Sequence, residues 1–263
     1  MTTEIVSGAA LAGAALASAR WPWWRRSVKG LPVLTYRVVG DPPPGSSMKS
    51  SWVAAGDFRA HLSWLRAEGY STLLFSDVLA AMRSGRRLPA RSVLMTFDGA
   101  YRDTCALAYP ALREFGAKAN VFVAFNYIGK ADLWKDAALE AWVPMAPLAT
   151  LKEMRDSGLV EFGSMTMNHV RLDALPPDDA AWEIAESRRQ LGTALGREIC
   201  AFAYPWGAGS SSDAVRSMAE RAGYSLDFSL EPGKGPSPGA WADGARGRLP
   251  VRRGDKALDL KLL

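Results

Sequence analysis

The sequence predicts an α/β fold in which a parallel sheet closes into a barrel, and three observations support this prediction. Short apolar runs alternate with stretches that have the 3.6-residue periodicity of amphipathic helices. About seven such strand–helix units follow one another, and repeated units of this kind form parallel sheets and barrels. The chain has 263 residues, of which 48% are hydrophobic, so it can bury a substantial core.

The first half of the chain begins with a predicted buried strand over residues 31–39 and a helix over residues 57–69. Asp57 is the expected N-cap of this helix, and the spacing of Phe58 and Leu62 places both on one helical face. The next predicted elements are strands over residues 71–75, 92–97 and 118–125 and helices over residues 76–85 and 101–116.

The second half of the chain continues the same alternation. Its predicted elements are strands over residues 160–164, 198–205 and 224–230 and helices over residues 148–158, 177–196 and 211–223. The longest of these helices is expected to end at Gly196, because glycine readily adopts the left-handed conformation that terminates helices. Residues 231–247 are rich in Gly and Pro and are expected to form a loop before a short strand at residues 248–251.

The N-terminal 30 residues differ in composition from residues 31–263, which are predicted to form one domain. Residues 5–19 are an uncharged run rich in Ala and Gly, shorter than the roughly 20 residues that span a bilayer. Trp and Arg residues follow, as they do at membrane interfaces. Two interpretations stay open: membrane association through residues 5–26, or a helix of small residues packed on the domain, which implies a cytoplasmic protein.

Charge and cysteine content narrow the function classes. The net charge is +5, but the basic residues are spread along the chain without a nucleic-acid-binding motif, so no nucleic-acid partner is expected. The basic clusters, including the one within residues 248–256, are expected to be solvated surface. Cys105 and Cys200 have neither metal-type spacing nor a disulfide pattern, and both are expected to be buried thiols.

Four segments place functional side chains where predicted strands end. In a parallel barrel, chemistry collects at the C-terminal ends of the strands, so these side chains are expected to line one pocket. The residues at these positions are Tyr36, Arg37, Asp98, Gly99, Met165, His169, Tyr204 and Trp206. Each also has a structural alternative. For example, Asp98 can cap the helix that follows it, and His169 can be a core or surface histidine.

The same segments resemble the motifs of the polysaccharide deacetylases, the NodB-like carbohydrate esterases. "VLMTFDGAYRD" is similar to the first motif (TFDDGY), "EFGSMTMNHVRL" to the second (GSHTxxHxxL) and "FAYPWG" to the third (FxYPxG). "LPVLTYRVVG" resembles the LxYHxV segment of the branch that deacetylates bacterial surface polysaccharides. The resemblance extends from Leu31 to Lys256 and therefore covers nearly the whole chain.

The resemblance implies a distorted (β/α) barrel of the cell envelope or periplasm that hydrolyses the non-peptide C–N bonds of N-acetylated amino sugars. It also implies a divalent metal, usually zinc, held by Asp-His-His, with a second Asp as base and a further His as acid. Carried over by position, the base falls on Asp98 and the second metal His on His169. The metal Asp falls on Gly99, the first metal His on Met165 and the acid His on Arg37.

These replacements predict that metal-dependent activity is lost or strongly impaired, because two of the three metal ligands and the acid are missing. His169 alone is insufficient, so no metal cofactor is expected. Two alternatives stay open. One is a metal-free pocket in which Tyr36, Tyr204 and Trp206 bind a sugar or another flat small ligand. The other is a metal-independent catalyst with Asp98 as general base. Natural drift and deliberate redesign of the pocket would both leave this pattern.

Overall fold

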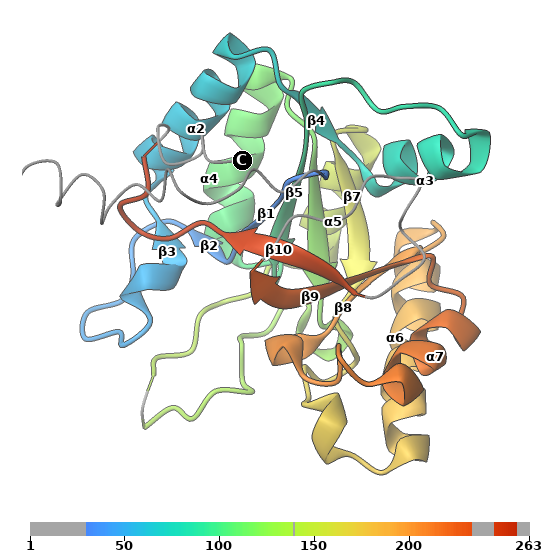
Figure 1. Ribbon diagram of the computed structural model, residues 1–263. Coiled ribbons are helices and arrows are strands. Elements are labelled where there is room, and N and C mark those ends of the chain that lie inside the picture. Colours follow the sequence, from blue (N-terminus) through green and yellow to red (C-terminus); the bar gives the residue numbers. More distant parts are fainter. Residues whose placement is uncertain (1–29, 139, 233–244, 257–263) are drawn as a thin grey trace, which may run out of the picture.

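Parallel strands close into a barrel with helices on its outside (Figure 1). The computed structural model describes residues 30–256 except residue 139 and residues 233–244. The strands, in order around the barrel, are β1 (Val33–Tyr36), β10 (Arg246–Pro250), β9 (Leu226–Pro232), β8 (Ala201–Ala203), β7 (Val160–Ser164), β6 (Ala119–Val123) and β5 (Ser92–Asp98). β5 pairs directly with β1 and so closes the barrel. The predicted α/β barrel is therefore confirmed.

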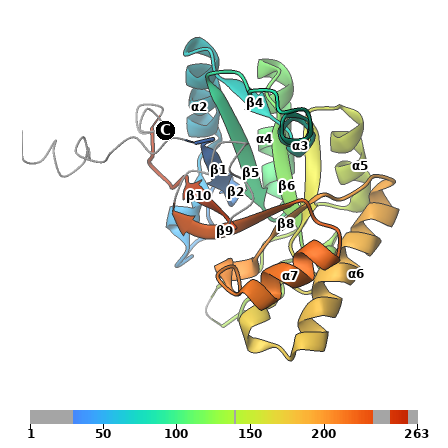
Figure 2. The same ribbon diagram turned by 45° about the vertical axis from the view of Figure 1, so that its right-hand side comes forward.

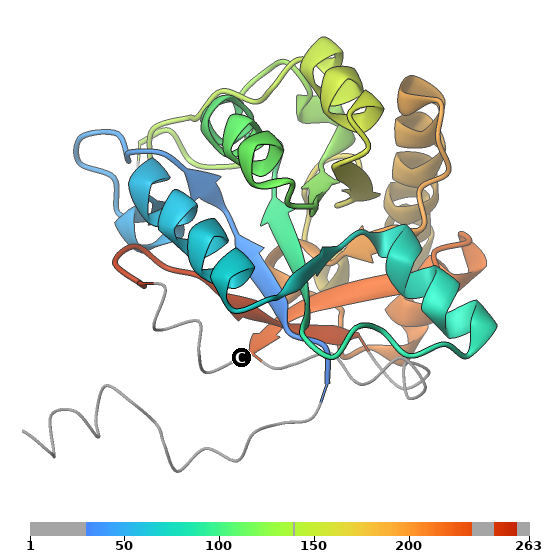
Figure 3. The same cartoon turned by 90° about the horizontal axis from the view of Figure 1, so that it is seen from above.

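The predicted helices are present, and several of them surround the barrel. They are α2 (Ala55–Ala67), α3 (Phe75–Ser84), α4 (Arg102–Phe115), α5 (Leu148–Asp156), α6 (Pro177–Leu195) and α7 (Asp213–Arg221). Seen from above, α2, α4, α5 and α6 follow one another around the strands (Figure 3). α6 and α7 lie side by side next to β8 and β9 (Figure 2). Gly196 ends α6 with a φ of 60°, as expected.

One end of the barrel is closed by α3. This helix starts after β4 (Ser71–Leu73), which pairs with the first residues of β5. Phe75, its first residue, is fully buried and packs against Phe122 and Phe228, with ring centroids 5.3 and 5.6 Å apart. A ligand that enters the barrel therefore has to use the opposite end, where the strands finish.

Several local predictions need correction, including the strand predicted over residues 198–205, which is shorter and spans Ala201–Ala203. α2 begins at Ala55, so Asp57 lies in its first turn and is not its N-cap. The stretch 31–39 forms two strands, because the chain leaves the barrel at Arg37 and β2 (Val38–Val39) pairs instead with β3 (Trp52–Val53). The terminal strand begins at Arg246, two residues before the predicted start.

Some predictions concern residues that the structure does not describe. The N-terminal segment up to Lys29 and most of the predicted Gly- and Pro-rich loop lie outside the described residues. Of the helices in the described part, none has both the length and the hydropathy to cross a membrane.

The alternation of side chains along β5 places Asp98 at the mouth of the barrel. The side chains of β5 belong to two apolar clusters. The cluster between the barrel and the helices contains Val93, Met95 and Phe97, and the cluster in the barrel interior contains Leu94, together with Phe75 of α3. Successive side chains of a strand point to opposite faces, so Asp98 shares the inward face with Leu94. Asp98 is the last residue of the strand, and its carboxylate therefore reaches the open end.

Candidate functional site

A pocket of about 490 Å³ lies at the C-terminal ends of the strands. It brings together the predicted residues Tyr36, Arg37, Asp98, Gly99, Met165, His169 and Trp206, which come from four distant segments. Tyr204 is the exception. Its side chain is fully buried and its hydroxyl donates to Asp227 Oδ2 at 2.9 Å, so it does not line the pocket as expected.

Asp98 is held by Arg248 of β10. Nη2 of Arg248 donates to Asp98 Oδ2 at 2.9 Å, and Nη1 donates to Oδ1. Asp98 does not cap α4, whose N-cap is Tyr101 without a side-chain cap. Arg248 is 0% exposed, so the prediction that residues 248–256 are solvated surface is wrong at this position. The guanidinium also donates through Nε to the carbonyl of Ser229 at 2.8 Å.

The loop after β7 presents His169 to the pocket in a left-handed backbone conformation, with a φ of 51°. Glu183 of α6 anchors this loop: its Oε2 accepts hydrogen bonds from the backbone N–H groups of Met167 and Asn168 at 2.9 and 3.0 Å. The Glu183 side chain is buried. Sequence reasoning missed this residue, because a glutamate in an amphipathic helix usually lies on the solvated face.

Two tryptophans enclose His169. Trp134 stacks on its ring, with centroids 4.2 Å apart, and Trp206 meets it edge-on at 4.8 Å. His169 Nδ1 and Trp134 Nε1 are buried without a hydrogen-bond partner in the described structure. Burial, together with the charge of Arg37, lowers the pKa of His169 to about 3, so its imidazole is neutral at physiological pH. Trp134 was not predicted, because it lies in a loop with no strong sequence pattern.

The positions that the resemblance assigns to the other metal ligands carry no side chain that ordinarily binds zinc. Gly99 has a φ of 90°, and a Cβ added there would lie 2.7 Å from the Tyr101 ring. Met165 is 3% exposed and packs with the barrel interior. Within the described residues, no group of three or more His, Cys, Asp or Glu side chains could hold a metal. These residues therefore do not fit the three-ligand site that the resemblance implies.

Tyr36 lines the pocket but directs its hydroxyl toward the core. The side chain is 1% exposed, and its Oη lies 3.2 Å from Nδ1 of the buried His61. Its ring stacks against Phe97, with centroids 5.2 Å apart. Tyr36 therefore supports the pocket wall rather than offering a hydroxyl to a ligand.

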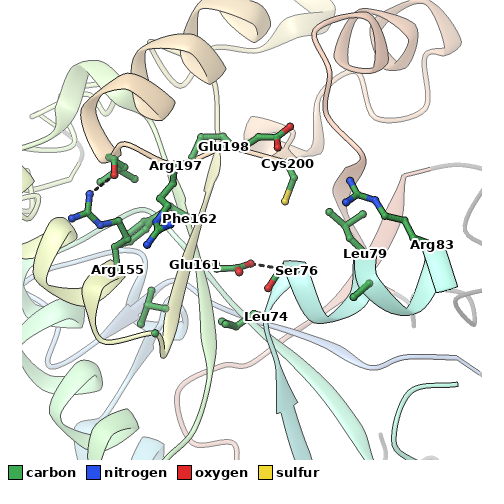
Figure 4. A pocket seen from close by; sticks show the side chains of 15 residues that line it. Leu74, Ser76, Leu79, Arg83, Arg155, Glu161, Phe162, Arg197, Glu198 and Cys200 are labelled. Carbon is green, nitrogen blue, oxygen red and sulfur yellow. Dashed lines mark hydrogen bonds between the residues drawn. The ribbon is translucent and has the colours of Figure 1, made fainter. Parts of the chain in front are cut away.

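A second pocket, of about 430 Å³, lies between α3 and the starts of β7 and β8 (Figure 4). Glu161 accepts a hydrogen bond there from the backbone N–H of Ser76 at 2.9 Å. Burial raises the pKa of the Cys200 thiol to about 11, which keeps it protonated. Cys105 and Cys200 are both free thiols, and Cys200 is only partly buried. None of the residues singled out from the strand ends lines this pocket, so it is not the candidate site.

The closed parallel barrel and the pocket at its strand ends define an α/β-barrel protein with a candidate ligand site. The sequence profile described as polysaccharide deacetylase matches residues 85–226, more than half of the chain. The chain belongs to the polysaccharide deacetylase family.

Two relatives illustrate the similarity in sequence. YxkH of Bacillus subtilis is 29% identical over 203 residues, which cover 77% of this chain and 65% of that protein. Poly-β-1,6-N-acetyl-D-glucosamine N-deacetylase of Escherichia coli is 25% identical over 255 residues, covering 83% of this chain and 36% of that protein. The chain thus spans less than two thirds of the length of these relatives.

Solved structures share the fold. The deacetylase PplD of Streptococcus pyogenes, in complex with acetate, superposes with a TM-score of 0.75 at 24% identity, covering 89% of this chain and 97% of that one. IcaB from Ammonifex degensii superposes with a TM-score of 0.73 at 25% identity, covering 89% and 96%.

Proposed function

We propose that this member of the polysaccharide deacetylase family binds a sugar in the pocket at the strand ends without the family's metal. Under this proposal, metal-dependent hydrolysis of N-acetyl C–N bonds is lost or strongly impaired. The observation that carries the proposal is the identity of the residues at the positions where the family's metal ligands are expected. Gly99 and Met165 stand where two ligands are expected, and the remaining carboxylate, Asp98, is ion-paired with Arg248.

The local backbone supports this proposal. An aspartate at position 99 would need a left-handed backbone that residues with a side chain rarely adopt, and its Cβ would overlap the buried Tyr101 ring. A thioether, as at Met165, is a poor ligand for zinc. The positive charge of Arg37, which lines the same pocket, would repel a divalent cation.

The lining of the pocket supports a carbohydrate ligand. Trp206 is 43% exposed and offers an aromatic surface, and pockets that combine aromatic walls with a few polar groups are typical of small-molecule sites. Relatives from Escherichia coli and Staphylococcus aureus carry the name poly-β-1,6-N-acetyl-D-glucosamine N-deacetylase, which makes an amino-sugar polymer the natural first ligand to test.

The alternative of a metal-independent catalyst with Asp98 as general base is less well supported. A base has to accept a proton, and protonation of Asp98 would leave the fully buried guanidinium of Arg248 without a counter-ion. An uncompensated buried charge is strongly destabilising.

Metal content and sugar binding test the proposal together. We expect the purified full-length protein, dialysed against a chelator, to contain less than stoichiometric zinc by elemental analysis. It should still bind an N-acetylglucosamine tetramer in calorimetry and release no acetate from it. Trp206→Ala should weaken this binding by about tenfold or more, as loss of an aromatic contact does.

A matched control is Trp182→Ala on α6, because Trp182 is 53% exposed and lies outside the pocket. This variant should bind the tetramer like the unmodified protein. Tightly held zinc, together with acetate release that the chelator abolishes, would contradict the proposal.

A further inference from the structure

The pocket contains guanidinium groups that have no carboxylate partner among the described residues. Arg37 donates through Nη1 to the sulfur of Met48 at 3.4 Å and lies close to the Tyr101 hydroxyl, both of which are neutral. The side chain of Arg252, also on the pocket wall, is exposed and forms no ion pair with any residue that the structure describes. Among the described residues that line the pocket, Asp98 is the one with an acidic side chain. Both of its carboxylate oxygens already accept hydrogen bonds from Arg248.

The two arginines of β10 differ from Arg37, because each has a carboxylate partner. Arg246 and Arg248 are both buried, and each is paired with an aspartate, Asp227 and Asp98 respectively. Arg37 is half-buried, and withdrawing a guanidinium from water without a counter-ion costs free energy. An anion supplied by the ligand would remove this cost.

The surroundings of Arg37 suit a ring that carries one negative group. Trp206 and Trp134 form an aromatic wall that is fixed by contact with His169. The guanidinium groups of Arg37 and Arg252 line the same pocket. The charge at the pocket mouth therefore comes from the guanidinium groups, and the apolar contact comes from the indole rings.

On the basis of the proposed sugar-binding function, we infer that the bound sugar carries a carboxylate, as the hexuronic acids do. The carboxylate pairs with Arg37 and the sugar ring lies against Trp206. A planar guanidinium can form two parallel hydrogen bonds with a planar carboxylate, which gives both strength and orientation. Arg252 at the edge of the pocket adds a second positive charge that attracts the acidic chain.

Two ligands that differ only in charge test this inference. The full-length protein is titrated calorimetrically with a galacturonic acid tetramer and with the same tetramer after reduction of its carboxyl groups to alcohols. We expect the acidic tetramer to bind about tenfold tighter or better, as charge-assisted hydrogen bonds allow. The difference should shrink as salt is raised, because salt screens exposed charges.

Variants assign the preference to one residue. Arg37→Met should bring the two affinities to about the same value, and Arg37→Lys should keep part of the preference. Arg66→Met, on the exposed side of α2, is the matched control and should keep the full preference. If Arg37→Met does not fold, the comparison of the two tetramers on the unmodified protein still decides whether the pocket prefers an acidic sugar.

The outcomes separate this inference from the proposed function. Equal affinity for both tetramers would overturn the acidic-sugar inference and leave the metal-free sugar pocket standing. A preference that Arg37→Met leaves unchanged would overturn the role of Arg37. Failure of both tetramers and of the N-acetylglucosamine tetramer to bind would overturn the sugar pocket itself.

Discussion

Arg248 is the largest side chain that is completely buried in the described structure. Its guanidinium lies over the Phe122 ring at 5.4 Å and within 3.3 Å of Thr35 Oγ1, deep among the strands. A charge in such a place is tolerated only as part of a pair, because the loss of one partner leaves the other uncompensated. The Asp98–Arg248 pair is therefore a structural requirement of the barrel mouth as well as a feature of the pocket.

Breaking this pair should cost much more than breaking a surface pair. We expect Arg248→Met to lower the free energy of unfolding by about 3–5 kcal/mol, measured by urea denaturation. Most of this loss should be recovered in the double variant Asp98→Leu/Arg248→Met, which removes both charges. Arg59→Met, which breaks an exposed pair with Glu114, is the control and should cost at most about 1 kcal/mol. An effect of Arg248→Met no larger than the control would refute this view.

The sequence could predict one half of this pair but not the other. Asp98 follows a buried strand directly, and the strand-end rule for parallel barrels identifies it without further information. Arg248 lies 150 residues away in a basic stretch, and such stretches are usually solvated. Only the pairing of β1 with both β5 and β10 brings Arg248 to Asp98.

At the scale of elements, α6 holds the loop that carries His169. Glu183 reaches from the middle of α6 and accepts backbone N–H groups of Met167 and Asn168, while its Oε1 accepts the Asn168 side-chain amide at 2.6 Å. Asn126 donates to the Asn168 side chain at 2.7 Å from the loop after β6. Helix α6 and the loops after β6 and β7 thus fix the position of His169 jointly.

Removal of the Glu183 carboxylate should loosen this loop without unfolding the barrel. We expect Glu183→Ala to lower the free energy of unfolding by about 1–3 kcal/mol, because it leaves buried N–H groups without acceptors. The amides of Met167 and Asn168 should exchange faster in hydrogen-exchange measurements. Glu186→Ala removes the same type of side chain about one helix turn further along α6, where the carboxylate is half-buried and paired with Arg189, and it should leave both amides unchanged. Unchanged exchange in Glu183→Ala would show that other contacts hold the loop.

The elements themselves were largely predictable, and their exceptions have physical causes. The strands of a barrel covered by helices are apolar on both faces, which gives the continuous runs recognised in the sequence. Because Val38 and Val39 are as apolar as the strand before them, the sequence pattern did not reveal the break between β1 and β2. Buried partners such as Glu183 depend on contacts across the fold, which local patterns do not contain.

At the scale of the whole molecule, the pocket depends on the meeting of distant parts of the chain. Arg37 follows β1, Asp98 ends β5 and Arg248 belongs to β10, and these strands are neighbours because β1 pairs with both others. The sequence predicted this convergence from the common direction of parallel strands. The side-chain partners inside the pocket required the structure, since ion pairing and stacking depend on the register of the strands.

The acid stability of the whole protein should depend on its two histidines. Burial lowers the pKa of His61, and burial with the nearby Arg37 lowers that of His169 to about 3, whereas an unfolded histidine has a pKa near 6.5. Both are therefore neutral in the folded protein at pH values at which the unfolded chain already binds protons. Stability is fully present above about pH 6.5 and is lost as pH falls below it.

We therefore expect the free energy of unfolding, measured by urea denaturation, to be constant near neutral pH and to fall between about pH 6.5 and pH 5. The slope should approach at most about 1.4 kcal/mol per pH unit for each histidine. His169→Phe keeps an aromatic ring between Trp134 and Trp206 but cannot bind a proton, so its slope should be smaller than that of the unmodified protein. The range above pH 5 separates this effect from the carboxylates, whose protonation begins lower. A free energy of unfolding that stays constant down to pH 5 would show that the folded protein protonates both imidazoles as readily as the unfolded chain, and the neutral, tryptophan-enclosed His169 would then be ruled out.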